Sequence, residues 1–124
     1  MKHKILVVDD EWSMRELLKN TLMLSGFDVL LAKDAVEFRQ IALNEKLDLI
    51  ILDILLGDHD GTRVYADLVT EGLEPSTPVV FLSALAEDRP PTFPQPGRRY
   101  ALVGKPFDPS KLVDRLQKFL AATN

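Results

Sequence analysis

The sequence contains no cysteine among its 124 residues. This absence excludes a disulfide framework, a zinc site built on cysteines and a thiol nucleophile. Long apolar runs are also missing, because the longest have four or five residues whereas a membrane-spanning helix needs ~20. The charged start at residues 1–5 is not followed by a long apolar stretch. We therefore expect no signal peptide, no membrane association and a cytoplasmic location.

An excess of basic charge is absent as well. The 15 lysines and arginines face 19 aspartates and glutamates, which gives a formal charge of −4. A protein that binds the nucleic-acid backbone needs a basic surface, so we expect no direct contact with nucleic acid. The composition is otherwise that of an ordinary globular protein, and the length fits one domain over residues 1–124.

Short, continuous apolar runs predict buried strands. Strands covered by helices on both faces are apolar without alternation, as in a parallel sheet. A further run at 27–32 includes the charged Asp28, which is typical of an edge strand. The four continuous runs lie at residues 5–8, 49–52, 79–82 and 101–103.

Between these runs, apolar residues recur at helical spacing. Gly26 ends the first helical segment, and Asp34 with Glu37 resembles a capping box at the start of the second. A third segment spans 62–71, and Asp108 caps the last. Alternating strands and helices predict a parallel α/β sheet with helices on both faces. In such sheets a ligand binds beyond the carboxyl ends of the strands.

Polar residues follow four of the expected strands at that edge. Asp9 and Asp10 follow the first strand, Asp53 the third, Ser83 the fourth and Lys105 the fifth. Because converging like charges repel, a divalent cation is the natural way to neutralise them, and oxygen ligands favour Mg²⁺ over zinc or copper. A neutralised carboxylate beside a lysine is suited to receive a phosphoryl group.

In these motifs the sequence resembles the receiver domains of two-component response regulators. The resemblance covers essentially the whole chain and implies a flavodoxin-like fold, which is a doubly wound, five-stranded parallel sheet with strand order 2-1-3-4-5. It also implies a phosphoacceptor that promotes its own phosphorylation and slow dephosphorylation, rather than a conventional enzyme. The matching motifs are residues 5–11 (ILVVDDE), 49–53 (LIILD), Gly61, 81–84 (FLSA) and 105–107 (KPF).

The resemblance assigns a role to each matching residue. Asp53 matches the aspartate that takes a phosphoryl group from a histidine kinase or a histidine phosphotransfer protein. Asp10 and Asp53 are implied to bind Mg²⁺ directly, together with the backbone carbonyl of Leu55. Asp9 is implied to hold a metal-bound water.

Two further residues have implied roles in this site. Lys105 pairs first with the carboxylate and then with the phosphoryl oxygens, and the bond from Lys105 to Pro106 is usually cis in the family. Ser83 supplies a hydroxyl that turns inward to the phosphoryl group. Leu55 and Leu85 would flank that group, and since apolar side chains do not activate water, we expect slow self-dephosphorylation.

The sequence departs from the family at three places. Gly57 stands where a proline is common, which loosens the loop. Leu102 occupies the position of an aromatic residue whose rotation reports phosphorylation, and Tyr100 lies two residues earlier on the same strand face. The proline-rich segment 87–97 cannot form a regular helix, so we expect the fourth helix to be missing or irregular.

Other interpretations remain open on the sequence alone. The chain could be a degenerate receiver that acts as a non-switching interaction module. Residues 58–62 spell the Asp-x-Asp-Gly-Thr of haloacid-dehalogenase-type phosphatases, although a polar loop leading into the helix at Gly61 is the simpler interpretation. Ser83 could merely satisfy a turn. The downstream output is unknown, and the sequence fits a stand-alone regulator, a phosphorelay intermediate or an excised domain.

Overall fold

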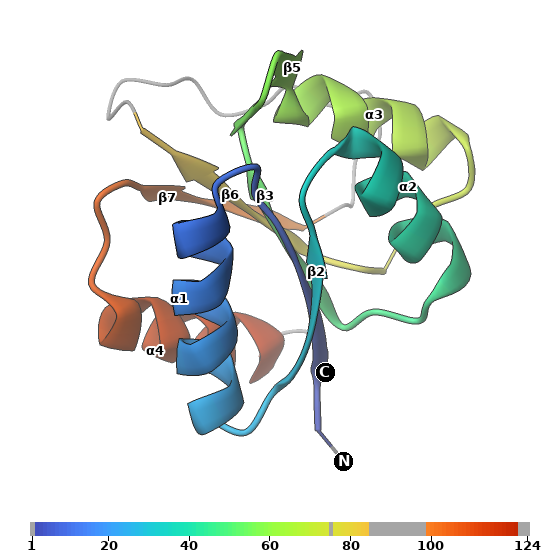
Figure 1. The fold of residues 1–124 in the computed structure, drawn as a ribbon. Helices are drawn as coiled ribbons and strands as arrows, with labels where there is room; N and C mark the ends of the chain where they lie inside the picture. The colour runs from blue at the N-terminus through green and yellow to red at the C-terminus, as the bar shows by residue number, and fades with distance from the viewer. Residues whose placement is uncertain (1, 75, 85–98, 122–124) are drawn as a thin grey trace.

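The computed structural model describes residues 2–74, 76–84 and 99–121. Its five main strands form one parallel sheet in the order β2-β1-β3-β6-β7 (Figure 1). Since β6 and β7 are the fourth and fifth of these strands in the chain, the predicted flavodoxin-like order 2-1-3-4-5 is confirmed. The strands are β1 (Lys4–Val8), β2 (Asp28–Ala32), β3 (Leu49–Asp53), β6 (Val79–Ser83) and β7 (Tyr100–Gly104).

Helices cover both faces of the sheet, with α1 and α4 on one face and α2 and α3 on the other (Figure 1). Successive side chains of a strand point to opposite faces. Ile51 therefore packs in the core under α1 and α4, whereas Ile50 and Leu52 pack under α2 and α3. The helices are α1 (Trp12–Leu24), α2 (Ala35–Asn44), α3 (Gly61–Thr70) and α4 (Pro109–Ala121).

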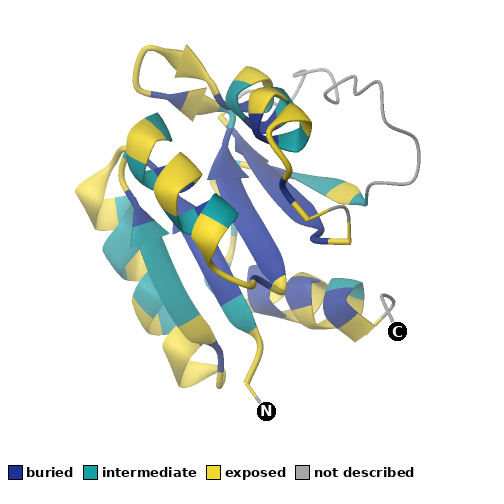
Figure 2. Ribbon diagram, turned by 90° about the vertical axis from the view of Figure 1, so that its right-hand side faces the viewer, coloured by how far each residue is buried: buried dark blue, intermediate teal, exposed yellow. Residues whose placement is uncertain are grey.

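Burial separates the middle of the sheet from its edges. Every residue of β3 and β6 is buried, whereas the edge strands β2 and β7 keep partly exposed positions (Figure 2). The edge strand predicted from the run at 27–32 is thereby confirmed. The prediction of a missing or irregular fourth helix falls on 87–97, which lies outside the described residues. In the part of the chain that is described, no helix has both the length and the apolar character to cross a membrane.

Side chains cap α2 and α4, as the sequence indicates. Asp34 accepts a hydrogen bond from the backbone N–H of Glu37 at 2.8 Å at the start of α2. The Glu37 carboxylate accepts in turn from the backbone N–H of Lys33 at 2.9 Å, one residue earlier than in the standard capping box. Asp108 begins α4 by accepting from the N–H of Ser110 at 3.0 Å. These bonds satisfy backbone donors that a helix start leaves unpaired.

The expectation of a polar loop at 58–62 is wrong in part, because its first residues belong to a β-hairpin. β4 (Leu55–Leu56) pairs antiparallel with β5 (His59–Asp60). Gly57 lies in the two-residue turn with φ of 60°, a left-handed conformation that glycine adopts without strain. Gly61 then begins α3, as predicted. The hairpin follows β3 directly and so lies at the carboxyl end of the sheet (Figure 1).

Candidate functional site

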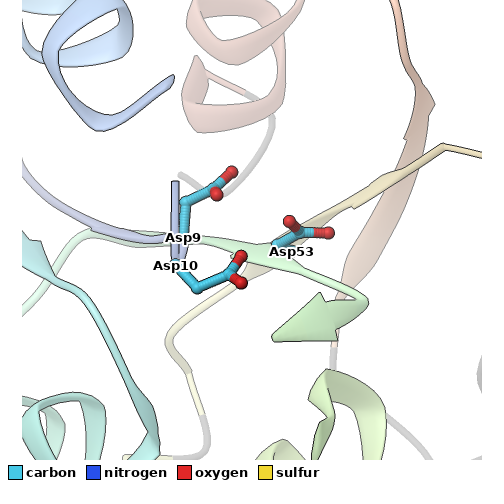
Figure 3. Close-up of side chains that lie close together, drawn as sticks. All are labelled: Asp9, Asp10 and Asp53. Atoms are coloured by element: carbon cyan, nitrogen blue, oxygen red, sulfur yellow. The ribbon is translucent and has the colours of Figure 1, made fainter. Parts of the chain in front are cut away.

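Three carboxylates meet at the carboxyl end of the sheet (Figure 3). Asp9 and Asp10 follow β1, and Asp53 is the last residue of β3. One oxygen atom from each lies within 4.8 Å of the others. Asp9 and Asp53 are buried, whereas Asp10 is exposed to solvent. The cluster thus has a buried floor and one open side.

The pairing of the strands explains why these side chains lie together. β1 and β3 are hydrogen-bonded neighbours in register, so Asp9, just after β1, lies beside Asp53 at the end of β3. Each carboxylate is also held by a backbone N–H two residues further on. Asp9 Oδ1 accepts from Glu11 at 2.9 Å, and Asp53 Oδ1 accepts from Leu55 at 3.1 Å. A hydrogen bond from the backbone two residues further on therefore fixes one oxygen of each buried carboxylate.

Lys105 follows β7 and reaches both buried carboxylates. Its Nζ lies 3.0 Å from Asp53 Oδ2 and 3.4 Å from Asp9 Oδ2. Its backbone N–H donates to the carbonyl of Ser83 at 2.5 Å, which extends the pairing of β6 and β7 as far as the site. The bond from Lys105 to Pro106 is cis, as the resemblance implies. The ammonium group is thus anchored from a third strand against two carboxylates.

Burial, hydrogen bonds and neighbouring charges shift the pKa values of Asp9 and Lys105. Burial raises the pKa of Asp9, and this effect exceeds the opposing effects of the Glu11 N–H and the Lys105 charge. Burial by itself would lower the pKa of Lys105, but the hydrogen bond to Asp53 and the charges of Asp9 and Asp53 raise it overall. Lys105 therefore stays protonated while it faces more carboxylates than it can neutralise.

The donor set suits a hard divalent cation. All the charged donors of the cluster are carboxylate oxygens, and one ammonium group stands against three carboxyl groups. Oxygen ligands with an open side for water are what Mg²⁺ prefers, whereas zinc and copper favour nitrogen or sulfur. Within the described ranges, this is the one acidic group of metal-binding geometry. The residues present therefore fit Mg²⁺.

The backbone carbonyl of Leu55, which the family resemblance implies as a Mg²⁺ ligand, does not point toward β5. Hydrogen-bonded and non-hydrogen-bonded pairs alternate along an antiparallel ladder. The N–H of Gly61 donates to the carbonyl of Ile54 at 2.5 Å, so the next pair, Leu55 with Asp60, is a non-hydrogen-bonded one. The ladder therefore directs the Leu55 carbonyl away from β5. Its metal contact stays a prediction.

Ser83 and Gly61 complete the surroundings of Asp53. Ser83 ends β6, and β6 lies between β3, which carries Asp53, and β7, which leads to Lys105. Ser83 is only 2% exposed. The inward-turning role of its hydroxyl stays a prediction. A Cβ atom on Gly61 would overlap the backbone carbonyl oxygen of Asp53. Glycine at this position lets α3 begin directly against the strand that carries Asp53.

Arg15 is a residue of this site that the sequence analysis missed. Its Nη1 donates to the backbone carbonyl of Asp9 at 2.7 Å. A side chain that binds a backbone carbonyl leaves no recognisable residue pattern. The available signal was its position, one turn into the helix that follows the acidic pair.

The acidic motif at 58–62 has a structural role. Asp60 accepts hydrogen bonds from the backbone N–H of Thr62 at 3.0 Å and from its hydroxyl at 2.7 Å, and so caps α3. Asp58 lies exposed in the turn of the hairpin. Neither residue belongs to the cluster of Asp9, Asp10 and Asp53. The arrangement therefore gives no support to a phosphatase that acts through this motif.

Tyr100 lies at the other end of its strand from the site. It pairs with Val79 at the start of β6, whereas Gly104 pairs with Ser83 at the end. Its ring packs edge-on against Phe81, with ring centroids 6.3 Å apart. Because residues two apart share a strand face, it lies on the same side of the sheet as the residue at 102 but further from the site.

The fold and the site together define the class of CheY-like domains. The chain is similar in structure to a receiver domain protein (CheY-like) from Methanospirillum hungatei, with a TM-score of 0.87 and 25% identity over 99% of this chain and 97% of the other. A second similar structure is the chemotaxis protein CheY4 of Vibrio cholerae, with a TM-score of 0.78 and 26% identity over 95% of this chain and 98% of the other.

Sequence comparison then gives the family. A profile of the response regulator receiver domain matches residues 5–117, and the chain belongs to this family of two-component signalling domains. The chain is 37% identical over 120 residues to the alkaline phosphatase synthesis transcriptional regulatory protein PhoP of Bacillus subtilis. The matched stretch covers 97% of this chain and 49% of that protein. It is 35% identical over 121 residues to a probable transcriptional regulator of Porphyridium aerugineum, covering 96% of this chain and 48% of that protein. The chain spans about half the length of these relatives.

Proposed function

We propose that the chain accepts a phosphoryl group on Asp53, with Mg²⁺ bound, from the phosphohistidine of a histidine kinase or of a histidine phosphotransfer protein. The observation that carries this proposal is the contact of Lys105 with Asp53, 3.0 Å long, at the edge where Asp9 and Asp10 also lie. The arrangement offers a fixed carboxylate, a cation beside it and oxygen donors for a metal ion. Membership of the receiver family supports the same function.

In the proposed reaction the Asp53 carboxylate is the nucleophile. A new bond forms between one of its oxygens and phosphorus while the bond from phosphorus to the imidazole nitrogen of the donor breaks, and that nitrogen keeps the electron pair. Such transfer depends on in-line positioning and charge neutralisation more than on acid–base help. The Leu55 N–H holds Oδ1 and Lys105 holds Oδ2, so the carboxylate plane is set before the donor arrives.

Lys105 and Ser83 have separate tasks after transfer. The Lys105 ammonium is close enough to exchange its bond to Asp53 for one to a phosphoryl oxygen, and its raised pKa keeps it charged. The buried Ser83 hydroxyl would donate to another phosphoryl oxygen. Both interactions place donors where negative charge would otherwise be unbalanced.

The acidic cluster would hold the metal ion. Asp10, Asp53 and the Leu55 carbonyl are proposed as direct ligands, and Asp9 as the holder of a metal-bound water. Bound Mg²⁺ supplies neutralisation of the phosphoryl oxygens. Among the described residues, Lys105 is the cation that pairs with both buried carboxylates, and one ammonium group cannot neutralise them and a phosphoryl group together.

Intact mass after incubation with Mg²⁺ and acetyl phosphate tests the proposal. We expect one phosphate adduct on the wild type and none on Asp53→Ala. Asp58→Ala is the matched control, because Asp58 is an exposed acidic residue on the adjacent hairpin, and it should gain the adduct like the wild type. Absence of the adduct from the wild type, with beryllofluoride also failing to bind, would overturn the proposal.

The partners and the output belong to the same proposal. Relatives of twice the length are named transcriptional regulators, so we propose that residues 1–124 form one receiver domain that can act beside an output domain or protein. Direct contact of this domain with nucleic acid is not expected. The cytoplasmic location stays a prediction.

One observation favours a second candidate, the non-switching interaction module. The position of the usual reporting aromatic is Leu102, and Tyr100 packs on Phe81 at the far end of the strand. A domain of this kind would gain the phosphate adduct without any change elsewhere. Hydrogen exchange of the wild type with and without beryllofluoride distinguishes the two, because a switching domain changes protection beyond the site itself.

A further inference from the structure

Arg15 connects the first helix to the acidic edge of the sheet. It lies one turn into α1 and is partly buried. Its Nη1 donates to the backbone carbonyl of Asp9 at 2.7 Å, a short bond for a charged donor. The contact spans the whole turn between β1 and α1, so it ties the strand end to the helix that follows.

The carbonyl that Arg15 binds belongs to the peptide unit between Asp9 and Asp10. A peptide unit is planar, so fixing its carbonyl fixes the direction in which the next residue leaves it. The Asp9 side chain has other anchors, because it accepts from the Glu11 N–H and from Lys105. Asp10 is exposed, and packing does not fix its carboxylate. The orientation of Asp10 therefore depends on the backbone that Arg15 holds.

We propose that Arg15 is a positioning residue for Mg²⁺, acting through the peptide unit that joins Asp9 and Asp10. It touches neither the acceptor nor the metal-binding oxygens in this role. The inference rests on the proposed function, because it concerns the same metal site. It adds a residue that the family resemblance did not assign.

Arg15 would affect the affinity for Mg²⁺ in two opposing ways. Its positive charge lies near the acidic cluster and by itself repels a cation, so removing it should tighten Mg²⁺ binding. Its hydrogen bond orients the backbone before Asp10, so removing it should weaken binding. The sign of the change therefore separates a positioning residue from a charged bystander.

The test is a Mg²⁺ titration of the wild type, Arg15→Met and Arg15→Lys, followed by calorimetry and by Trp12 fluorescence. Trp12 is two residues from Asp10 and 68% exposed, so its emission can report on this edge. We expect Arg15→Met to bind Mg²⁺ about tenfold more weakly, as for other residues that orient metal ligands. Arg15→Lys keeps one donor and the charge, and its affinity should lie between those of the other two.

Lys19→Met is the matched control. Lys19 is the next cation along α1 and pairs with Glu16 at 3.3 Å, away from the Asp9 carbonyl. Its loss should change Mg²⁺ affinity by less than about twofold, because Lys19 is partly exposed and salt screens its charge. Thermal unfolding without Mg²⁺ checks that each variant is folded. If Arg15→Met does not fold, Arg15→Lys alone decides, because a positioning residue predicts weaker binding and a bystander predicts no change.

Each result has a defined meaning. Weaker binding in Arg15→Met with partial rescue in Arg15→Lys supports the inference. Equal or tighter binding in Arg15→Met, with normal binding by the wild type, overturns the inference and leaves the proposed function standing. A wild type that does not bind Mg²⁺ overturns the proposed metal site itself, and the inference with it.

Discussion

β3 and β7 are parallel strands of the same sheet, yet they differ in burial and in how closely they follow the receiver pattern. All five residues of β3 are buried, and its last residue is the proposed acceptor Asp53. In β7 only Val103 is buried, and Leu102 stands where the family has an aromatic residue. Under the proposed function, acceptance of a phosphoryl group and its relay would depend on different strands, so one could be kept while the other changes.

The largest expected effect comes from crowding the strand that carries the acceptor. Gly61→Ala would place a methyl group on the Asp53 carbonyl oxygen, so the backbone must move. We expect a loss of about 3 kcal/mol in the free energy of unfolding, measured in urea, as for severe overpacking. Gly104→Ala on β7 is the control, because its added Cβ meets no atom within 4 Å.

The control should change stability by less than about 1 kcal/mol. Phosphorylation should also slow in Gly61→Ala and stay near normal in Gly104→Ala. If the two variants lose stability equally, the contrast between the strands does not hold.

The next effect concerns the lifetime of the phosphorylated form. The Leu55 side chain is 67% exposed beside Asp53 and offers no group that could orient a water molecule. Leu55→Asn supplies an amide, and one added hydrogen bond to water should speed dephosphorylation by about fivefold. The half-life of the adduct by intact mass checks this expectation. An unchanged half-life would argue against slow self-dephosphorylation caused by Leu55.

A smaller effect is the pH dependence of stability without Mg²⁺. The pKa of Lys105 is raised in the folded protein, so its contribution to stability is fully present below its usual value of 10.5 and is lost as the pH rises through the folded value. In urea unfolding with EDTA present, the free energy of unfolding should therefore fall more steeply with rising alkaline pH for the wild type than for Lys105→Met. Equal slopes would contradict the ion pairing of Lys105 with Asp9 and Asp53.

Asp9 changes stability in the same direction as Lys105, but at acidic pH. Because burial raises its pKa, the folded protein holds this proton more tightly than the unfolded chain does. Its contribution therefore falls as the pH rises from 3.8 through the folded value. Asp9→Asn, which removes the buried charge, should be more stable than the wild type at neutral pH in EDTA. A less stable variant would show that pairing with Lys105 outweighs burial.

The smallest effect on phosphorylation is expected at Tyr100. Its position at the start of β7 is remote from Asp53, and remote sites act independently. Tyr100→Ala should change the rate of adduct formation by less than about twofold, because Tyr100 lies at the end of β7 that is far from the site. The variant should also lose about 1 kcal/mol in the free energy of unfolding, because the packing of Tyr100 on Phe81 is lost. A large change in rate would place part of the acceptor chemistry on β7.

Much of the fold followed from the sequence because burial leaves a strong signal. The apolar runs around Ile51 and Val80 marked strands covered on both faces, and strand ends in a parallel sheet meet at one edge. That rule predicts that Asp9, Asp53 and Lys105 lie together, and Lys105 does contact both carboxylates.

Other features depend on interactions that residue types do not encode. The hairpin was missed because Gly57 was interpreted as a loosening of the loop, although its left-handed conformation closes a tight turn. Arg15 was missed because its partner is a backbone carbonyl, and every residue has one. The opposing pKa effects at Lys105 require distances, which a sequence does not contain.

The place of Asp53 in the middle of the sheet has a consequence for timescales. β3 is hydrogen-bonded to β1 on one side and to β6 on the other. Amide hydrogens in such a strand exchange with solvent only when a large part of the domain opens, whereas surface turns open freely. Asp53, the proposed acceptor, is therefore expected in the slowest-exchanging layer of the molecule. A deuterium label on β3 measures the opening of the whole domain, and a faster signal that follows phosphorylation must come from the turns around it.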